Sequence, residues 1–324
     1  MKKMLAAILT AALGMSLLVG CGSSSESADS AAAETTEVSE EEMIAEGYTE
    51  TGDGYYSVVT WCTNGDYNIY GEFYYPEDFD ESQSYPVIIM SHGLAVTHTI
   101  YESAEWTSSA ASRGYVCYIF DFCGGAESNY SDGDFLEMST LTEKDDLDSV
   151  IDFVKSFEWC DEDNLFLMGQ SKGGLVSAME AADRNEEIAG LILLYPGFGE
   201  VDRLHETYPT YEDIPEDTIE FLDRTLGRIY ATDIYDLDIM EYISGYTGDV
   251  LLIHGINDVT VPYTYSVQAL TEAYADSESE LVLISGSSAV HAFDKFYEEG
   301  RAVAQNAVWQ YLETHLTTEE EESE

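Results

Sequence analysis

Six short runs of apolar residues recur along this chain, and they limit its fold more than any other feature. Each run is continuous rather than alternating, and each is followed within a few residues by glycine. The runs read VIIM, VCYIF, LFLM, LILL, VLLI and LVLI, at residues 87–90, 116–120, 165–168, 191–194, 250–253 and 281–284. Continuous runs of this length are typical of strands buried on both faces, as in a parallel sheet.

Amphipathic stretches lie between these runs and predict the helices that connect the strands. They cover residues 105–114, 140–158, 172–183, 263–275 and 296–316. Thr140 or Thr142 is expected to cap the second of them. The alternation predicts an α/β fold, with a mostly parallel central sheet and helices on both faces. Before it, alternating residues around Asn64-Gly65 predict an antiparallel hairpin that starts at Tyr55.

Residues 198–247 interrupt this pattern. The segment is aromatic and acidic, its periodicity is broken, and it contains no obvious buried strand. Because it falls between two predicted strands, we expect it to form a lid-like insertion over the ends of the sheet. Its aromatic residues could line a pocket or pack within the insertion, and the sequence leaves both open; they are Tyr208, Tyr211, Phe221, Tyr230 and Tyr235.

The first twenty residues have the layout of a bacterial secretory signal, with two lysines before an apolar stretch and then small residues. The ending LVGC resembles the lipobox of bacterial lipoproteins, which implies cleavage before Cys21 and a lipid on its thiol. An ordinary signal peptide that happens to end in cysteine is the alternative. We therefore expect an exported domain, outside the cytoplasm and anchored to the membrane by lipid.

The rest of the chain divides by composition into three parts. Residues 21–47 are rich in Ser, Ala, Thr and Glu, which predicts a disordered tether. Residues 48–316 form the predicted folded domain, and residues 317–324 an acidic tail.

The net charge is −52, from 64 acidic and 12 basic residues. Without a basic patch, the chain is not expected to bind nucleic acid, and neutral or cationic substrates are favoured over polyanionic ones. Four cysteines follow the N-terminal one: Cys62, Cys117, Cys123 and Cys160. Cys117 is expected in the core, and pairing among the four stays open. No Cys/His spacing indicates a metal site, and we expect no cofactor.

Three polar residues follow predicted strands in an order that indicates nucleophilic catalysis. Ser171 lies in GQSKGG after LFLM, Asp258 follows VLLI, and His291 follows LVLI. The carboxyl ends of parallel strands meet at one edge of a sheet, so a serine, a base and an orienting carboxylate can converge there. Gly169 and Gly173 leave room for the sharp strand-to-helix turn that such a serine requires.

Other residues compete for these roles. Asp249 precedes its strand and so lies at the wrong end of the sheet, and Asp294 is expected to open the last helix. His92 and His254 each precede glycine at a strand end and are expected to be structural. The remaining histidines are His98, His205 and His315, the last in the terminal helix.

Two backbone amides are expected to bind a developing oxyanion. One belongs to Lys172, directly after the serine, and the other to Leu94, in the loop SHGL after the first parallel strand. The Lys172 side chain could make a specificity contact, but we expect it to point away from the substrate while its amide acts.

Together these motifs resemble the α/β-hydrolase family over residues 55–315. GQSKGG resembles its nucleophile elbow, SHGL its oxyanion loop, LLIHGINDVTVP its acid loop and SSAVHAF its histidine loop. Within the family, the segment after VCYIF is most similar to bacterial cinnamoyl or feruloyl esterases. The resemblance implies a Ser171–His291–Asp258 triad that cleaves a small-molecule ester through an acyl-enzyme.

The chain departs from these esterases at three places. Gln170 stands where they commonly have His, Lys172 where they have Gln, and residues 124–126 read Gly-Gly-Ala instead of Gly-His-Gly. These differences leave the acyl group undetermined. An exported serine peptidase or an acyltransferase on the same fold is the alternative, followed by a binding lipoprotein without activity.

Overall fold

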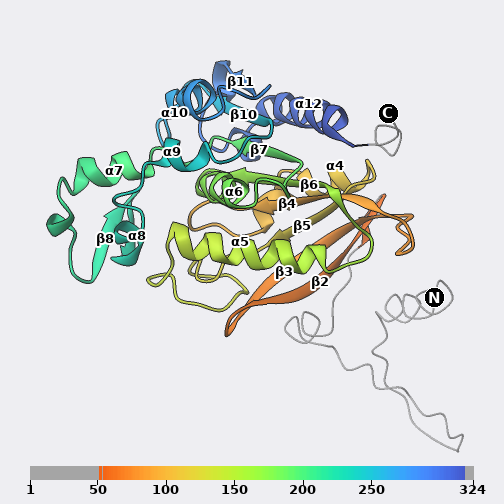
Figure 1. Ribbon diagram of the computed structural model, residues 1–324, viewed down its shortest axis with the longest axis horizontal. Helices are drawn as coiled ribbons and strands as arrows, with labels where there is room; N and C mark the ends of the chain where they lie inside the picture. Colours follow the sequence, from red (N-terminus) through yellow and green to blue (C-terminus); the bar gives the residue numbers. More distant parts are fainter. Residues whose placement is uncertain (1–50, 53, 318–324) are drawn as a thin grey trace, which may run out of the picture. The chain divides into compact units, whose positions relative to one another are not determined.

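The computed structural model describes residues 51–52 and 54–317 (Figure 1). The predicted signal peptide, Cys21, the tether and nearly all of the acidic tail lie outside these residues. The described part contains a nine-stranded sheet of order β1-β2-β3-β5-β4-β6-β7-β10-β11. Its strands are β1 (Thr51–Gly52), β2 (Tyr55–Asn64), β3 (Tyr67–Pro76), β4 (Tyr85–Ser91), β5 (Val116–Phe120), β6 (Cys160–Gln170), β7 (Gly190–Leu194), β10 (Val250–Gly255) and β11 (Glu280–Ile284).

The six apolar runs became the six parallel strands, β4 to β7, β10 and β11. The predicted hairpin is also present as antiparallel β2 and β3, and β3 pairs antiparallel with β5. Its register pairs Asn64 with Tyr67, so the two turn residues are Gly65 and Asp66 rather than Asn64 and Gly65. Gly65 has φ of 58°, a conformation that glycine adopts at little steric cost.

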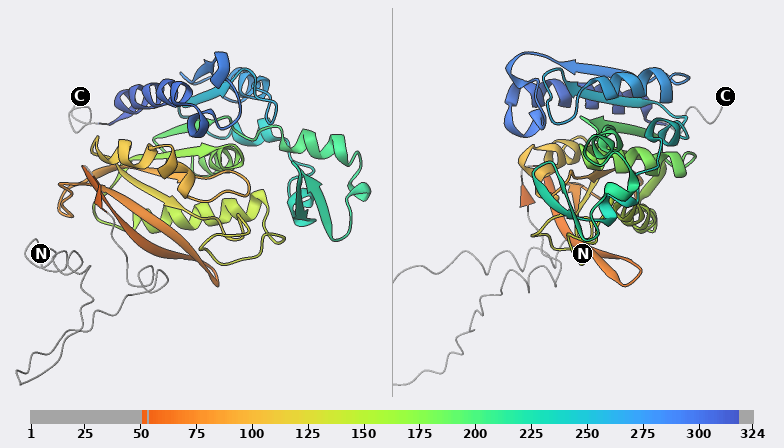
Figure 2. Two further views of the ribbon diagram at one scale, coloured as in Figure 1. Left: turned by 180° about the vertical axis from the view of Figure 1, so that it is seen from behind. Right: turned by 90° about the vertical axis from the view of Figure 1, so that its left-hand side faces the viewer.

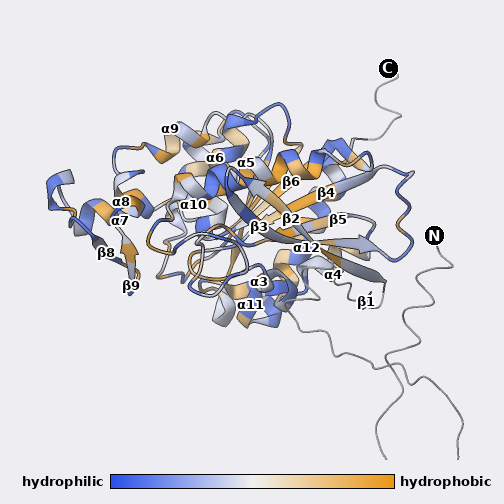
Figure 3. Cartoon of the chain, turned by 90° about the horizontal axis from the view of Figure 1, so that it is seen from below, coloured by the Kyte–Doolittle hydropathy of each residue, from blue (hydrophilic) through white to orange (hydrophobic). Residues whose placement is uncertain are grey.

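Helices cover both faces of the sheet, as the alternation predicted (Figure 1). They are α3 (Thr99–Ser103), α4 (Trp106–Ala111), α5 (Thr140–Lys155), α6 (Lys172–Asp183), α10 (Thr264–Gln268), α11 (Phe293–Phe296) and α12 (Glu298–His315), with a π-helical turn over Ala269–Ala273 and a 3₁₀ turn over Gly286–Ser288. Successive side chains of a strand point to opposite faces of the sheet and so pack into two different hydrophobic cores. Val87 and Ile89 pack with α5 and α6, while Ile88 and Met90 pack with α4 and α12. Figure 3 shows hydrophobic residues concentrated on the central strands.

Helix α5 begins at Thr140, so its N-cap is the residue before either expected cap. Ser139 is the N-cap: its hydroxyl accepts from the Thr142 amide, and the Thr142 hydroxyl accepts from the Ser139 amide. The prediction of Thr140 or Thr142 was therefore wrong, although Thr142 does take part in the cap. A reciprocal pair of this kind satisfies two of the amides that a helix start leaves free.

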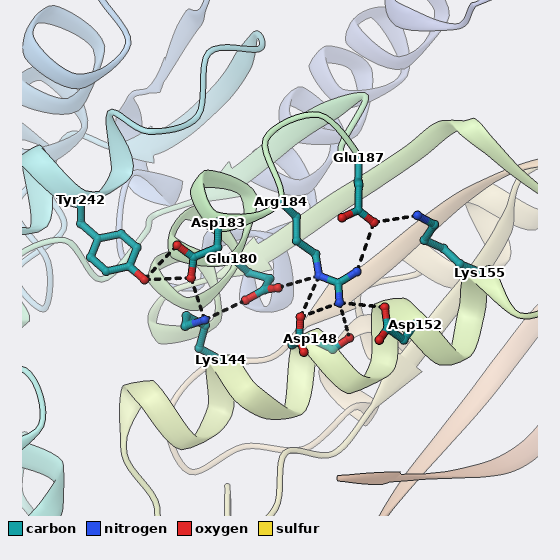
Figure 4. Close-up of polar contacts among 9 residues, drawn as sticks. All are labelled: Lys144, Asp148, Asp152, Lys155, Glu180, Asp183, Arg184, Glu187 and Tyr242. Carbon is teal, nitrogen blue, oxygen red and sulfur yellow. Dashed lines mark hydrogen bonds and ion pairs between the residues drawn. The ribbon is translucent and has the colours of Figure 1, made fainter.

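A network of ion pairs joins α5 to the C-terminal end of α6 and the residues that follow it (Figure 4). Arg184 contacts Asp148 and Asp152 of α5 at 2.5 and 2.7 Å and also reaches Glu180 and Glu187. The network also contains Lys144, Lys155, Asp183 and Tyr242. Helix α6 starts directly after Ser171, so this network fixes the helix that presents the predicted nucleophile.

The insertion at residues 198–247 contains α7 (Glu200–Thr207), a 3₁₀ turn over Tyr211–Asp213, β8 (Thr218–Phe221), β9 (Arg224–Gly227), α8 (Ile229–Thr232) and α9 (Ile239–Ile243). Strands β8 and β9 form a separate antiparallel pair with Ile219, Phe221 and Leu226 buried. The expectation of no buried strand was wrong here, because these four-residue strands are too short to stand out. Figure 2 shows the β8–β9 hairpin at one end of the central sheet.

No helix among the described residues is long and apolar enough to span a bilayer.

Candidate active site

Ser171 occupies a strained turn between β6 and α6. Its φ and ψ are 52° and −120°, a region that residues with a side chain rarely adopt. The glycines on either side make this turn possible. A Cβ at Gly169 would lie 2.4 Å from the Gly173 carbonyl oxygen, and a Cβ at Gly173 would lie 2.1 Å from that of Ser91. Only glycine fits at both positions, which is the steric requirement of a nucleophile elbow.

The structure brings Ser171, His291 and Asp258 into one hydrogen-bonded chain. His291 Nε2 lies 3.0 Å from Ser171 Oγ, and His291 Nδ1 lies 2.7 Å from Asp258 Oδ2. The three residues come from the loops that follow β6, β11 and β10. Ser171 and His291 remain partly exposed, while the Asp258 side chain is buried.

Asp258 is held as an ionised carboxylate. Its Oδ1 accepts from the backbone amides of Thr260 and Val261 at 2.8 and 2.9 Å. Burial acts to raise the pKa of Asp258, but hydrogen bonds from His254 and His291 hold it well below its usual range. An ionised carboxylate can only accept, so His291 carries its proton on Nδ1. Its Nε2 is then free to accept the Ser171 proton.

The competing histidines lie in structural roles. His92 is buried, its Nε2 accepts from the Phe122 amide, and its Nδ1 donates to the Gly93 carbonyl. Burial lowers the pKa of His92 to about 4, which keeps it neutral. His254 is also buried and contacts the Ser266 hydroxyl and the Val261 carbonyl, so it stabilises the loop that carries Asp258.

Three further histidines lie outside the hydrogen-bonded chain of the site. His98 is buried against Asp121 at 2.8 Å, and His205 contacts the Tyr235 carbonyl in the insertion. His315 pairs with Asp249 at 3.2 Å, before β10 and therefore away from the strand ends that carry Ser171.

Asp294 does not open the last helix, contrary to expectation. Helix α12 begins at Glu298, and Asp294 is fully buried within α11. Its carboxylate accepts from Trp106, Gln170 and Tyr195 at 2.9, 2.6 and 2.7 Å. Three strong donors explain how a buried carboxylate is tolerated there.

This contact gives Gln170 the role that the sequence left unexplained. Gln170 ties the residue before the nucleophile to Asp294, which also binds Tyr195. The Tyr195 ring in turn packs edge-on against His291, with centroids 4.7 Å apart. The sequence held no signal for this arrangement, because Gln170 and Asp294 are 124 residues apart.

The two expected oxyanion donors lie beside Ser171. Leu94, Ser171 and Lys172 line one pocket. Lys172 is the first residue of α6, a position whose amide has no partner within the helix. The loop that carries Leu94 approaches closely, since a Cβ on Gly93 would lie 3.2 Å from Ser171 Cβ. The Ala95 amide donates to the Gly125 carbonyl, so the divergent Gly-Gly-Ala segment supports this loop.

The pocket beside Ser171 is small, about 90 Å³, and the insertion supplies one wall. Its lining mixes apolar and charged residues: Leu94, Phe221, Leu222, Val261, Pro262 and Tyr265 with Lys172, Glu200, Arg203 and Glu206. Of the five insertion aromatics considered from the sequence, Phe221 lines this pocket. Tyr230 is fully buried, and Tyr235 packs against His205 and Tyr211 within the insertion.

The four cysteines of the described region are unpaired, and Cys117 is buried in the core as expected. Residues 51–52 and 54–317 contain no group of three His, Cys, Asp or Glu side chains placed to hold a metal ion.

The sequence matches the family described as serine aminopeptidase, S33, over residues 82–234, slightly less than half of the chain. Among solved structures, it is similar to Est1E of Butyrivibrio proteoclasticus with ferulic acid bound. That match has 22% identity and a TM-score of 0.67, and covers 78% of this chain and 98% of Est1E.

Two further matches have lower identity. An acetyl xylan esterase of Paenibacillus sp. R4 has 18% identity and a TM-score of 0.59, covering 81% of this chain and 84% of that one. A putative dipeptidyl aminopeptidase IV of Bacteroides ovatus has 18% identity and a TM-score of 0.61, covering 84% and 37%. These likenesses show that the chain has the α/β-hydrolase fold, as its motifs predicted.

Proposed function

We propose that this chain is a serine hydrolase that cleaves carboxylic esters through an acyl-enzyme. The observation that carries the proposal is the continuous hydrogen-bond chain from Ser171 Oγ through His291 to the ionised Asp258. A nucleophile, a base and an orienting carboxylate in this order are what acyl transfer requires. The acetyl xylan esterases among the similar structures agree with this reaction.

The first half-reaction forms the acyl-enzyme. Ser171 Oγ attacks the ester carbonyl while His291 Nε2 takes the serine proton. The carbonyl oxygen becomes an oxyanion that the amides of Leu94 and Lys172 stabilise. The intermediate then collapses, the bond to the alcohol oxygen breaks, and His291 gives its proton to the leaving alcohol.

The second half-reaction releases the acid. His291 takes a proton from a water molecule, whose oxygen attacks the acyl carbon. Collapse of this second intermediate breaks the bond to Ser171 Oγ and returns the proton to Ser171. Throughout, Asp258 keeps the imidazole in the tautomer that presents a lone pair to Ser171.

The test compares the parent protein with Ser171→Ala on p-nitrophenyl acetate and on a panel that includes feruloyl and short acyl esters. We expect kcat to fall by at least about 10⁴-fold, as when other triad nucleophiles are removed. A fluorophosphonate probe should label the parent at Ser171 and leave the variant unlabelled. Turnover by Ser171→Ala at the parent rate would refute the proposal.

A serine peptidase is the second candidate, and one feature of the pocket favours it. Glu206 is exposed and lines the pocket beside Ser171, where its carboxylate could bind the amino group of a peptide. The family match to serine aminopeptidases agrees with this candidate. Aminoacyl-naphthylamides assayed beside the ester panel would separate the two, since the better substrate class has the higher kcat/KM.

We also propose that the domain is exported and anchored by a lipid on Cys21. The support is the apolar stretch that ends in LVGC and the polar segment that follows. Metabolic labelling with a fatty-acid probe should mark the parent protein, while Cys21→Ser should be unlabelled and leave the membrane fraction.

A further inference from the structure

The Lys172 side chain does not extend into solvent. It is 1% exposed, and its ammonium lies 3.0 Å from Glu143 Oε1 at the start of α5. The same ammonium lies 4.8 Å from the centre of the Tyr230 ring, in α8 of the insertion. A cation over an aromatic face is attracted to it, and more strongly when both are out of water. One of only twelve basic residues is therefore buried directly behind the predicted nucleophile.

A second buried carboxylate belongs to the same cluster. Glu200, the first residue of α7, is buried and accepts from the Thr140 hydroxyl at 3.1 Å. Burial raises the pKa of Glu200, while the positive charge of Lys172 acts to lower it. Burial likewise raises the pKa of Glu143, to about 7. Lys172 thus pairs with a carboxylate of α5 and lines the same pocket as a carboxylate of the insertion.

These contacts reach the wall of the pocket. Tyr230 packs against Phe221 with ring centroids 5.1 Å apart, and Phe221 lines the pocket beside Ser171. Lys172 and Glu200 line that pocket as well. A path of direct contacts therefore runs from the Lys172 ammonium, through the Tyr230 ring, to the surface that an acyl group would meet.

We propose that the Lys172 side chain is a positioning residue that holds the insertion against the nucleophile elbow and so sets which acyl groups the pocket accepts. The inference rests on the proposed ester hydrolysis. Without the ammonium, Glu143 would lose its buried counter-ion and the Tyr230 ring would lose the cation that lies over it, so the tie to the insertion would be broken. The insertion would move its wall outward, and the small pocket would widen.

The chain offers a matched control. Lys144 of α5 pairs with Glu180 of α6 at 3.3 Å, in the opposite sense to the pair of Lys172 and Glu143. Both glutamates are 1% exposed, and burial raises the pKa of each to about 7. Lys144 pairs with Glu180 and Asp183, and it does not line the pocket.

The experiment measures kcat/KM for p-nitrophenyl acetate and for a bulky feruloyl ester in Lys172→Met and Lys144→Met. In Lys172→Met, we expect the ratio of bulky to acetyl kcat/KM to rise about tenfold, the scale of a small change in pocket volume. In Lys144→Met we expect a change below about twofold. Because substitution keeps the backbone amide of residue 172, the proposed oxyanion donor is present in both variants.

If Lys172→Met does not fold, the same measurement is made on a double variant, Lys172→Met with Glu143→Leu. Replacing both members of a buried pair with apolar residues of similar size is often tolerated. The double variant lacks the ammonium and should show the same shift in the ratio.

Two outcomes overturn the inference: an unchanged ratio in the Lys172 variants, or an equal change in Lys144→Met. Fluorophosphonate labelling separates these from failure of the proposed function. A parent protein that is neither labelled at Ser171 nor active on any ester refutes the function itself. A labelled and active parent with an unchanged ratio refutes the role of Lys172 alone.

Discussion

Replacing Asp258 with asparagine should disable the site by reversing one hydrogen bond. Asp258 Oδ1 accepts from two backbone amides, those of Thr260 and Val261, and Oδ2 accepts from His291 Nδ1. An asparagine at this position has only one oxygen. It will take the place of Oδ1, because the reverse orientation would leave two amides unsatisfied against an NH₂ group.

The consequence falls on His291. The asparagine NH₂ then faces Nδ1 and donates to it, so the imidazole proton moves to Nε2. Leaving two backbone amides unsatisfied costs about 1–3 kcal/mol each, so the variant will not return to the productive orientation. A wrong tautomer in a triad lowers kcat by about 10⁴-fold. This corresponds to about 5 kcal/mol in the activation barrier.

The assay is kcat on p-nitrophenyl acetate, with urea unfolding to verify that the variant is folded. Asp294→Asn is the matched control. Asp294 is also a buried carboxylate near the site, but it accepts from Tyr195 and makes no hydrogen bond to His291. We expect the control to lose stability and to keep kcat within about tenfold, in line with typical point substitutions. A folded Asp258→Asn protein with more than a tenth of the parent kcat would refute this account.

Two further predictions concern stability. Burial raises the pKa of Glu143 and Glu180 from 4.5 to about 7, so the folded chain binds protons that the unfolded chain has released. The free energy of unfolding should therefore fall by a few kcal/mol as pH rises from about 4.5 to about 7; equal urea midpoints at pH 5 and pH 8 would contradict this. Arg184→Met should lower the free energy of unfolding by about 2 kcal/mol, because it leaves buried Glu180 with fewer cations. Arg224→Met, on the exposed side of β9, is the control, and equal losses in the two variants would argue against the network.

The fold could be predicted from the sequence because its signals are local. Each apolar run became one strand, and KGGLVSAMEAAD became α6 with the same bounds. The parallel topology then predicts where the candidate residues lie, since loops after parallel strands meet at one edge of the sheet. Ser171, Asp258 and His291 were expected at such loops, and the structure brings them within hydrogen-bond distance.

What could not be predicted depends on partners that are far apart in the sequence. Gln170 is held by Asp294, and nothing near either residue indicates the other. Lys172 was expected to act chiefly through its amide, with its side chain pointing away from the substrate. Its burial follows from Glu143, before it in the chain, and Tyr230, after it, which meet only once the insertion is folded.

The crossed pairs between α5 and α6 have a consequence for how the helices are aligned. One lysine comes from each helix and finds its glutamate on the other: Lys144 with Glu180, and Lys172 with Glu143. A slide of α6 by one turn, about 5.4 Å, would break both pairs at once. Glu143 would then be a buried carboxylate without its cation, and Glu180 would keep only Arg184. We infer that these pairs matter more for the alignment of α6 along α5 than for the strength of the contact between the two helices. They permit one longitudinal position of α6, and with it one position of Ser171.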